Sequence, residues 1–159
     1  MRSAEELASP QAVGRYAGLF QRARDAGLGT TVHTGETPAT NGEGVIAVIK
    51  HLKPRRIGHG IRAAYDDEAM RMLNGEGVTL EICPTSNLHT RAVSGLPEMS
   101  FVLQRFLKAG VRFTINTDAT YMLATDLRRE VELLYMSGIL SGEDVARCFA
   151  TAHESAFLK

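Results

Sequence analysis

Two histidines and two acidic residues stand where short apolar runs of this sequence end. His33 closes one run and Glu36 follows three residues on, past Gly35, while His59 and Asp118 close two later runs. Imidazole nitrogens and carboxylate oxygens are ligands for Zn²⁺, and a histidine with an unperturbed pKa of about 6.5 suits proton transfer at neutral pH. A glutamate on the turn after His33 can face the same cleft as a proton donor. These residue types point to a catalytic metal site.

Each of these residues also has a structural interpretation. His33 could bond to the backbone while Glu36 caps the next helix, and His59 could be a turn residue between two glycines, which accept positive φ. Asp118 could cap the segment after it, although Asp126 suits that role better. The residues alone leave both interpretations open.

Other polar residues carry weaker signals. The segment Pro84–Asn87 follows a strand-like run with hydroxyl and amide groups, which could bond a ligand or cap the loop, and we expect capping. The remaining histidines have no partner at metal-ligand spacing, and we expect surface or packing roles for them. They are His51, His89 and His153.

Apolar spacing and turn residues predict alternating helices and strands. The first helix is expected over about Pro10–Ala26, with Ser9 as N-cap and Gly27 past its end, and a loop is expected from Pro84 to about Pro97. Further helices are predicted at about 44–52, 66–73, 97–109, 123–136 and 141–158, and strands at 30–33, 56–58, 78–83 and 111–116.

This order is a helix followed by four βα units, which predicts an α/β fold with a parallel sheet covered by helices. Ligands of such folds bind at the carboxyl ends of the strands. Four units could form a small open α/β sandwich that is complete in itself, or one part of a (β/α)₈ barrel. Both architectures use the same unit, so the pattern does not choose between them.

Composition indicates an ordinary globular protein of 159 residues, with 44% hydrophobic and 23% charged residues. The 18 basic and 18 acidic residues balance, so electrostatics favours neither a nucleic-acid nor a membrane partner. No apolar run approaches the roughly 20 residues that span a bilayer, and we expect a cytoplasmic protein. Cys83 and Cys148 lack disulfide or zinc-knuckle spacing, and we expect reduced core thiols.

Four segments at the predicted strand ends share a family pattern. They are Thr31–Glu36 (TVHTGE), Arg56–Gly60 (RIGHG), Leu80–Asn87 (LEICPTSN) and Ile115–Asp118 (INTD). In order and spacing they resemble the C-terminal half of adenosine deaminases, which are metal-dependent amidohydrolases. The likeness runs from about Pro10 to the last residue. It implies that residues 1–159 form a single partial domain, the C-terminal half of a TIM-type (β/α)₈ barrel of about four strands with flanking helices.

The resemblance also implies roles. It makes His33 and Asp118 ligands of one Zn²⁺ and places Gly35 and Asp118 against the substrate. Glu36 matches the acid that protonates purine N1, and His59 matches the residue that orients and deprotonates the zinc-bound water. The implied reaction is hydrolytic deamination of adenosine or a related 6-aminopurine nucleoside, with release of ammonia.

Two departures from the family pattern qualify this expectation. The family's first strand carries a His-x-His pair that completes the metal site, and no histidine precedes His33. We therefore expect the chain alone to bind zinc weakly and to be inactive. Ala119 replaces a carboxylate that meets purine N7, so another 6-aminopurine is an open alternative to adenosine. A non-catalytic half-barrel that pairs with itself, or with an N-terminal half, is the second hypothesis.

Overall fold

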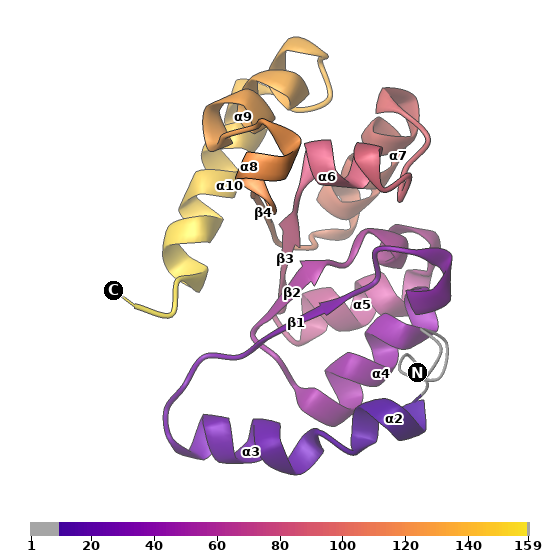
Figure 1. The fold of residues 1–159 in the computed structure, drawn as a ribbon, viewed down its shortest axis with the longest axis vertical. Coiled ribbons are helices and arrows are strands. Elements are labelled where there is room, and N and C mark those ends of the chain that lie inside the picture. The colour runs from indigo at the N-terminus through magenta and orange to yellow at the C-terminus, as the bar shows by residue number, and fades with distance from the viewer. Residues whose placement is uncertain (1–9, 159) are drawn as a thin grey trace.

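The computed structural model describes residues 10–158, and its centre is a parallel sheet of four strands (Figure 1). The strands pair in chain order, each parallel to the next, and the register aligns His33 with Gly58. This confirms the predicted parallel sheet. The strands are β1 (Thr31–Thr34), β2 (Arg56–His59), β3 (Thr79–Ile82) and β4 (Phe113–Ile115).

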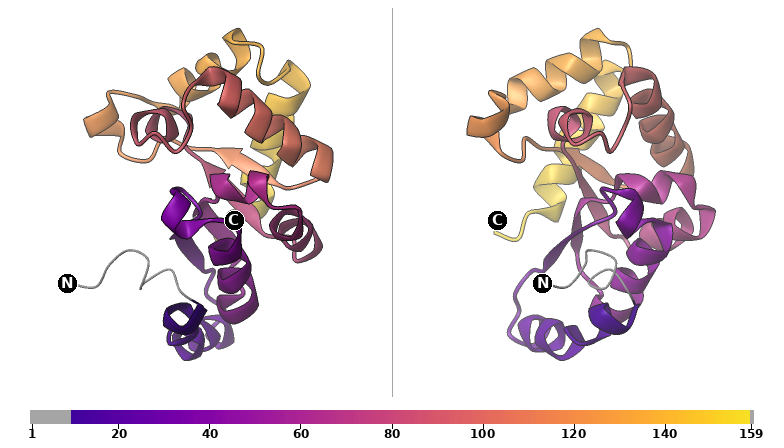
Figure 2. Two further views of the ribbon diagram at one scale, coloured as in Figure 1. Left: turned by 90° about the vertical axis from the view of Figure 1, so that its right-hand side faces the viewer. Right: turned by 45° about the vertical axis from the view of Figure 1, so that its right-hand side comes forward.

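Helices connect the strands and flank the sheet. On one side of the sheet lie α4 (Gly42–Leu52), α5 (Asp67–Gly75) and α7 (Leu96–Ala109), while α9 (Leu127–Met136) and α10 (Gly142–Ser155) pack beside β4 (Figures 1 and 2). The remaining helical segments are α2 (Pro10–Gly14), α3 (Ala17–Asp25), η1 (Pro38–Thr40), η2 (Ile61–Tyr65), α6 (Pro84–His89) and α8 (Thr120–Leu123).

The helix-covered face of the sheet is apolar. Side chains alternate between the faces of a strand, and Ile57, Leu80 and Ile82 point toward the helices and are 0% exposed. They join one hydrophobic cluster with residues of the covering helices, among them Val45 of α4 and Phe106 of α7. Burial of this cluster is the main force that holds the strands in register.

The other face of the sheet is polar. Thr31 and His33 are exposed on it, and Glu81 accepts hydrogen bonds from Thr31 Oγ1, at 2.9 Å, and from Arg56 of β2. Glu81, in the middle of β3, is half-buried and faces this polar side. Helices cover the apolar face, whereas the polar face leaves charged side chains accessible.

Three predicted segments differ from the structure. The single helix expected over 10–26 is broken into α2 and α3, because Tyr16 N bonds to Val13 O in a tight turn after Gly14. Ser9, its predicted cap, lies outside the described residues. The loop predicted after Pro84 begins with helix α6, since the fixed φ of proline suits the first helical position.

The helix predicted over 123–136 begins later, at Leu127, and the short helix α8 precedes it. Ala124, at φ 49°, ends α8, and α9 starts after Asp126, whose side chain accepts from Arg129 N at 3.0 Å. The expectation that Asp126 rather than Asp118 caps this helix is therefore confirmed. Cys83 and Cys148 are free and buried, as expected, and burial raises the pKa of each thiol to about 12. Among the described residues, no helix is long and apolar enough to cross a membrane.

Candidate functional site

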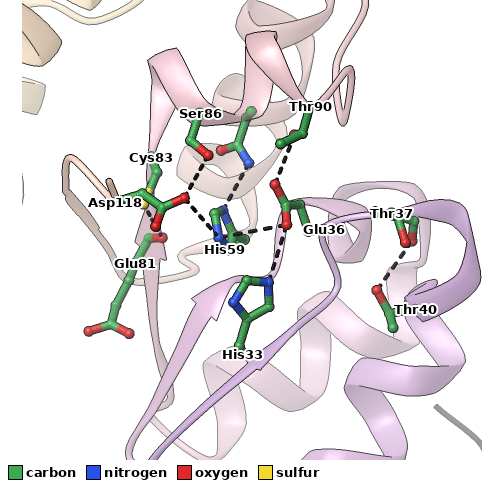
Figure 3. Close-up of polar contacts among 11 residues, drawn as sticks. His33, Glu36, Thr37, Thr40, His59, Glu81, Cys83, Ser86, Thr90 and Asp118 are labelled. Atoms are coloured by element: carbon green, nitrogen blue, oxygen red, sulfur yellow. Dashed lines mark hydrogen bonds and ion pairs between the residues drawn. The ribbon is translucent and has the colours of Figure 1, made fainter. Parts of the chain in front are cut away.

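The predicted site residues meet at the carboxyl end of the sheet (Figure 3). His33 lies in β1 with its side chain 66% exposed, and its Nε2 is 3.2 Å from Oε2 of Glu36. Glu36 is 13% exposed, and its other oxygen accepts from Thr90 Oγ1 at 2.8 Å. Glu36 is therefore held between two elements and does not act as a helix cap.

His59 ends β2 and is buried, at 3% exposed. Its ring centroid lies 4.5 Å from that of His33, and its Nε2 lies 3.8 Å from Glu36 Oε2 and 4.0 Å from Asp118 Oδ2. Burial lowers the pKa of His59 below its ordinary value of 6.5, Glu36 raises it, and His33 lowers it again. The neutral ring is thus favoured by its surroundings.

Asp118 follows β4 and remains 43% exposed. Ser86 Oγ donates to its Oδ2 at 2.7 Å, which fixes the orientation of the carboxylate. Asp118 and His59 both have positive φ, of 57° and 61°. Aspartate and histidine tolerate this region better than most residues, and such strain gathers at functional sites.

Two glycines let the ends of β1 and β2 approach each other. Gly35 has φ +70°, and a Cβ built there would lie 2.7 Å from Val45 Cγ2 and 2.9 Å from Gly60 Cα. The Arg62 N–H donates to Gly35 O at 2.7 Å across the same junction. Only a residue without a side chain fits, and this close approach brings Glu36 beside His59.

Helix α6 supplies site residues that the sequence did not identify. Ser86 contacts Asp118, the Asn87 amide nitrogen lies 3.0 Å from His59 Nδ1, and Thr90, just past the helix, donates to Glu36. We expected the segment Pro84–Asn87 to cap a loop, and for Ser86 and Asn87 this is wrong. Their position directly after a strand was the available signal, whereas Thr90 had none.

A buried carboxylate holds α6 in place. Glu130 of α9 is 0% exposed and accepts from Thr85 N at 2.9 Å and from Thr125 Oγ1 at 2.5 Å. Because Thr85 is in the first turn of α6, this contact ties α9 to the helix that carries Ser86 and Asn87. Glu130 had no functional signal in the sequence.

The geometry defines a group of metal-compatible atoms. Ligand atoms of His33, Glu36 and His59 all lie within 4.8 Å of one another. Asp118 is not in that group, although its Oδ2 is 4.0 Å from His59 Nε2. These nitrogen and carboxylate donors fit Zn²⁺ in kind. An adjoining pocket of about 280 Å³ is lined by Thr31, His33, Gly58, His59, Glu81, Cys83, Asn116 and Asp118.

Comparison with known proteins gives a consistent result. The model of the adenosine deaminase family matches residues 1–159. The chain is 38% identical over 146 residues to an adenine deaminase of Sinorhizobium medicae, covering 92% of this chain and 44% of that protein. It is 37% identical over 148 residues to an adenosine deaminase of Clostridium botulinum, covering 93% and 43%.

Solved structures share the fold. The adenine deaminase of Arthrobacter aurescens superposes with a TM-score of 0.80 at 28% identity, over 92% of this chain and 44% of that one. An amidohydrolase from Burkholderia ambifaria with bound Zn, at 19% identity and a TM-score of 0.75 over 91% of this chain and 40% of that one, shows the fold alone. These neighbours are TIM barrels, and this chain corresponds to under half of each. The chain belongs to the adenosine deaminase family.

Proposed function

We propose that this chain provides the His33, Glu36, His59 and Asp118 side of an active site for hydrolytic deamination of a 6-aminopurine. In this reaction water adds to the amine-bearing carbon, ammonia leaves, and a 6-oxopurine remains. The observation that supports the proposal is the convergence of these four side chains at the ends of β1, β2 and β4 in a chain that the family model matches throughout.

We assign His33 and Asp118 as zinc ligands. Ser86 holds Asp118 Oδ2 at 2.7 Å, and such an outer hydrogen bond orients a ligating carboxylate. When bound, zinc would supply the positive charge that lowers the pKa of a water from about 16 toward 7. The remaining protein ligands of such a site must come from outside these residues.

Glu36 and His59 are proposed to handle the protons. Glu36, fixed by Thr90 and facing both histidines, would protonate ring nitrogen N1 of the purine, which prepares the neighbouring carbon for attack. His59 would orient the attacking water and accept its proton. Gly35 is proposed to contact the purine through its backbone beside Glu36.

The substrate class follows from the relatives and from one substitution. The curated relatives include both adenine and adenosine deaminases, so a 6-aminopurine is the shared chemistry. Ala119, at the start of α8, offers no carboxylate for purine N7. We therefore propose a free base or nucleoside that carries the 6-amino group, with N7 recognised by another residue.

A chimeric enzyme tests the proposal, because this chain spans less than half of its relatives. In the chimera, this chain replaces the matching part of the Sinorhizobium medicae adenine deaminase, and ammonia release is measured with adenine, adenosine and deoxyadenosine. We expect turnover of at least one purine. Glu36→Gln should lower kcat by about 100-fold or more, since general acid catalysis contributes that much, whereas Glu43→Gln, at an exposed position of α4, should not. A folded chimera that deaminates no purine would contradict the proposal.

The chain on its own should bind zinc weakly and show negligible turnover, because only part of the ligand set is present. Competition with a chelator and metal analysis after dialysis measure the affinity. Tight stoichiometric zinc together with ordinary turnover of the isolated chain would show that these residues make a complete site.

The sheet supports a second candidate function. In the described sheet, β1 and β4 each pair with one neighbour only, which leaves an open edge on either side. Open edges favour pairing with another chain, so a non-catalytic half-barrel that self-associates is the alternative. Light scattering over a range of concentrations tests it, and a strictly monomeric species would exclude it.

A further inference from the structure

Glu130 of α9 is a buried carboxylate that bonds to two segments, and each of these segments leads to Asp118. It is 0% exposed, and one of its oxygens accepts a hydrogen bond from Thr85 N at 2.9 Å, in the first turn of α6. Its other oxygen accepts from Thr125 Oγ1 at 2.5 Å, at the end of the segment that follows Asp118. Helices α6 and α9 pack against each other (Figure 1). One side chain therefore joins the two segments.

The first segment, α6, reaches the side chain of Asp118. Ser86 comes directly after Thr85, and its Oγ donates to Asp118 Oδ2 at 2.7 Å (Figure 3). The first N–H groups of a helix have no partner within that helix, so Glu130 supplies the acceptor that α6 itself cannot offer to Thr85. This bond fixes the first turn of α6 and with it the hydroxyl that holds the Asp118 carboxylate.

The second segment runs from Asp118 to Thr125 and includes the short helix α8. Much of it is in contact with water, since Tyr121 and Met122 are 97% and 84% exposed. Thr125, in contrast, is buried at 9% exposed, and its hydroxyl bonds to Glu130. Burial of apolar side chains therefore contributes little to the conformation of α8, and the bond at Thr125 contributes more.

The backbone of this second segment is strained near both of its ends. Asp118 and Ala124 have positive φ, of 57° and 49°, and such a conformation persists only where the surrounding structure holds it. Arg129 Nη1 donates to Ala124 O at 2.6 Å, but this bond is exposed and water competes for it. The buried bond between Thr125 and Glu130 is thus the stronger restraint on the backbone that follows Asp118.

We propose that Glu130 is a positioning residue that holds the Asp118 carboxylate toward His59. It restrains the side chain of Asp118 through α6 and the backbone of Asp118 through Thr125. Both oxygens of Glu130 are engaged in these two bonds, so it acts on the site through other residues. The inference rests on the proposed function in that it takes Asp118 as a zinc ligand, whereas the restraint itself is a property of this chain without metal.

Hydrogen exchange of the backbone amides, measured by NMR on the metal-free 159-residue chain, tests the restraint. Glu130→Met should speed exchange of the Thr85 and Thr125 amides by about 10-fold or more, since both hydrogen bonds are lost. Glu130→Gln should keep these amides protected, because its oxygen can accept from Thr85 N and its amide nitrogen can donate to Thr125 Oγ1. Protection of the Leu80 amide, which bonds to a carbonyl of the neighbouring strand region, shows that the sheet is intact.

Two further variants complete the exchange experiment. Thr125→Val removes one hydroxyl and keeps the shape of the side chain, so it decides the question even if Glu130→Met does not fold. It should speed exchange of the Thr125 amide and leave Thr85 protected. Glu132→Met, at an exposed position of the same helix, is the matched control. Unchanged exchange at Thr125 in Thr125→Val, or faster exchange at Thr85 in Glu132→Met, would overturn the proposal.

Titration of the same chains with Zn²⁺ by calorimetry connects the restraint to the site. Glu130→Met should weaken the zinc affinity by about 10-fold or more, because residues that orient a metal ligand contribute that much, and Glu130→Gln should restore it. Equal affinities in the unaltered chain and in Glu130→Met would overturn the positioning role. An unaltered chain that binds no zinc would instead contradict the ligand assignment in the proposed function, and the exchange rates would still decide whether Glu130 holds the two segments.

Discussion

The two faces of the sheet follow different physical rules, although the same strands form both. The helix-covered face is built from Ile57, Leu80 and Ile82, which are excluded from water and need only fill space. The polar face carries Arg56 and Glu81, whose charges need partners and solvent. The apolar face thus provides stability, while the polar face and its carboxyl end provide chemistry, and mutations on the two faces should differ accordingly.

The largest difference is expected from truncation of a core side chain. Leu80→Ala should lower the free energy of unfolding by about 2 to 5 kcal/mol, because it leaves a cavity in the hydrophobic cluster. Thr31→Ala on the polar face removes an exposed hydroxyl and should cost no more than about 1 kcal/mol. Urea denaturation measures the free energy of unfolding of both variants. Equal losses in the two would contradict the conclusion that the apolar face provides the stability.

The close approach between the ends of β1 and β2 should also be sensitive to mutation. Gly35→Ala combines a positive φ with contacts of 2.7 Å and 2.9 Å, and should cost about 2 to 4 kcal/mol. Gly77→Ala has a similar φ of +64° but no atom within 4 Å, and should cost only about 1 to 2 kcal/mol. Urea denaturation gives the loss in free energy of unfolding for each variant, and the difference between the two losses is the cost of the steric contacts at Gly35. Equal losses would mean that only the strain of the positive φ matters.

The features that could be predicted from the sequence are those that local patterns determine. The four strands, the helices over the apolar face and the convergence of His33, His59 and Asp118 follow from local patterns, because alternation and turn residues are encoded within a few positions. The contacts of α6 are not local. Asn87 contacts a residue 28 positions away, and Glu130 accepts a hydrogen bond from a residue 45 positions away. Such partners depend on how the helices pack, which periodicity does not specify.

His59 is buried at the end of β2, so the free energy of unfolding should depend on pH through this residue. Its pKa is lowered in the folded chain, so the unfolded chain binds the proton more readily below pH 6.5. Stability from this residue is therefore present above that value and is lost as the pH falls below it, by at most about 1.4 kcal/mol per pH unit. Urea denaturation at a series of values from about pH 7.5 to about pH 5 should show that the free energy of unfolding depends less steeply on pH in His59→Asn than in the unaltered chain. Identical slopes would contradict a buried neutral ring.

The smallest effect is expected for the ion pair on the polar face. Arg56 and Glu81 are 25% and 17% exposed, so solvent screens their attraction, and a double-mutant cycle should give a coupling of about 1 kcal/mol or less. Arg56→Gln and Glu81→Gln, singly and together, provide the cycle in urea, and added salt should weaken the coupling. A coupling as large as the loss in Leu80→Ala would mean that the polar face is as important for stability as the core. A small coupling energy would mean that stability does not constrain the residues of the polar face, which can then serve binding and chemistry.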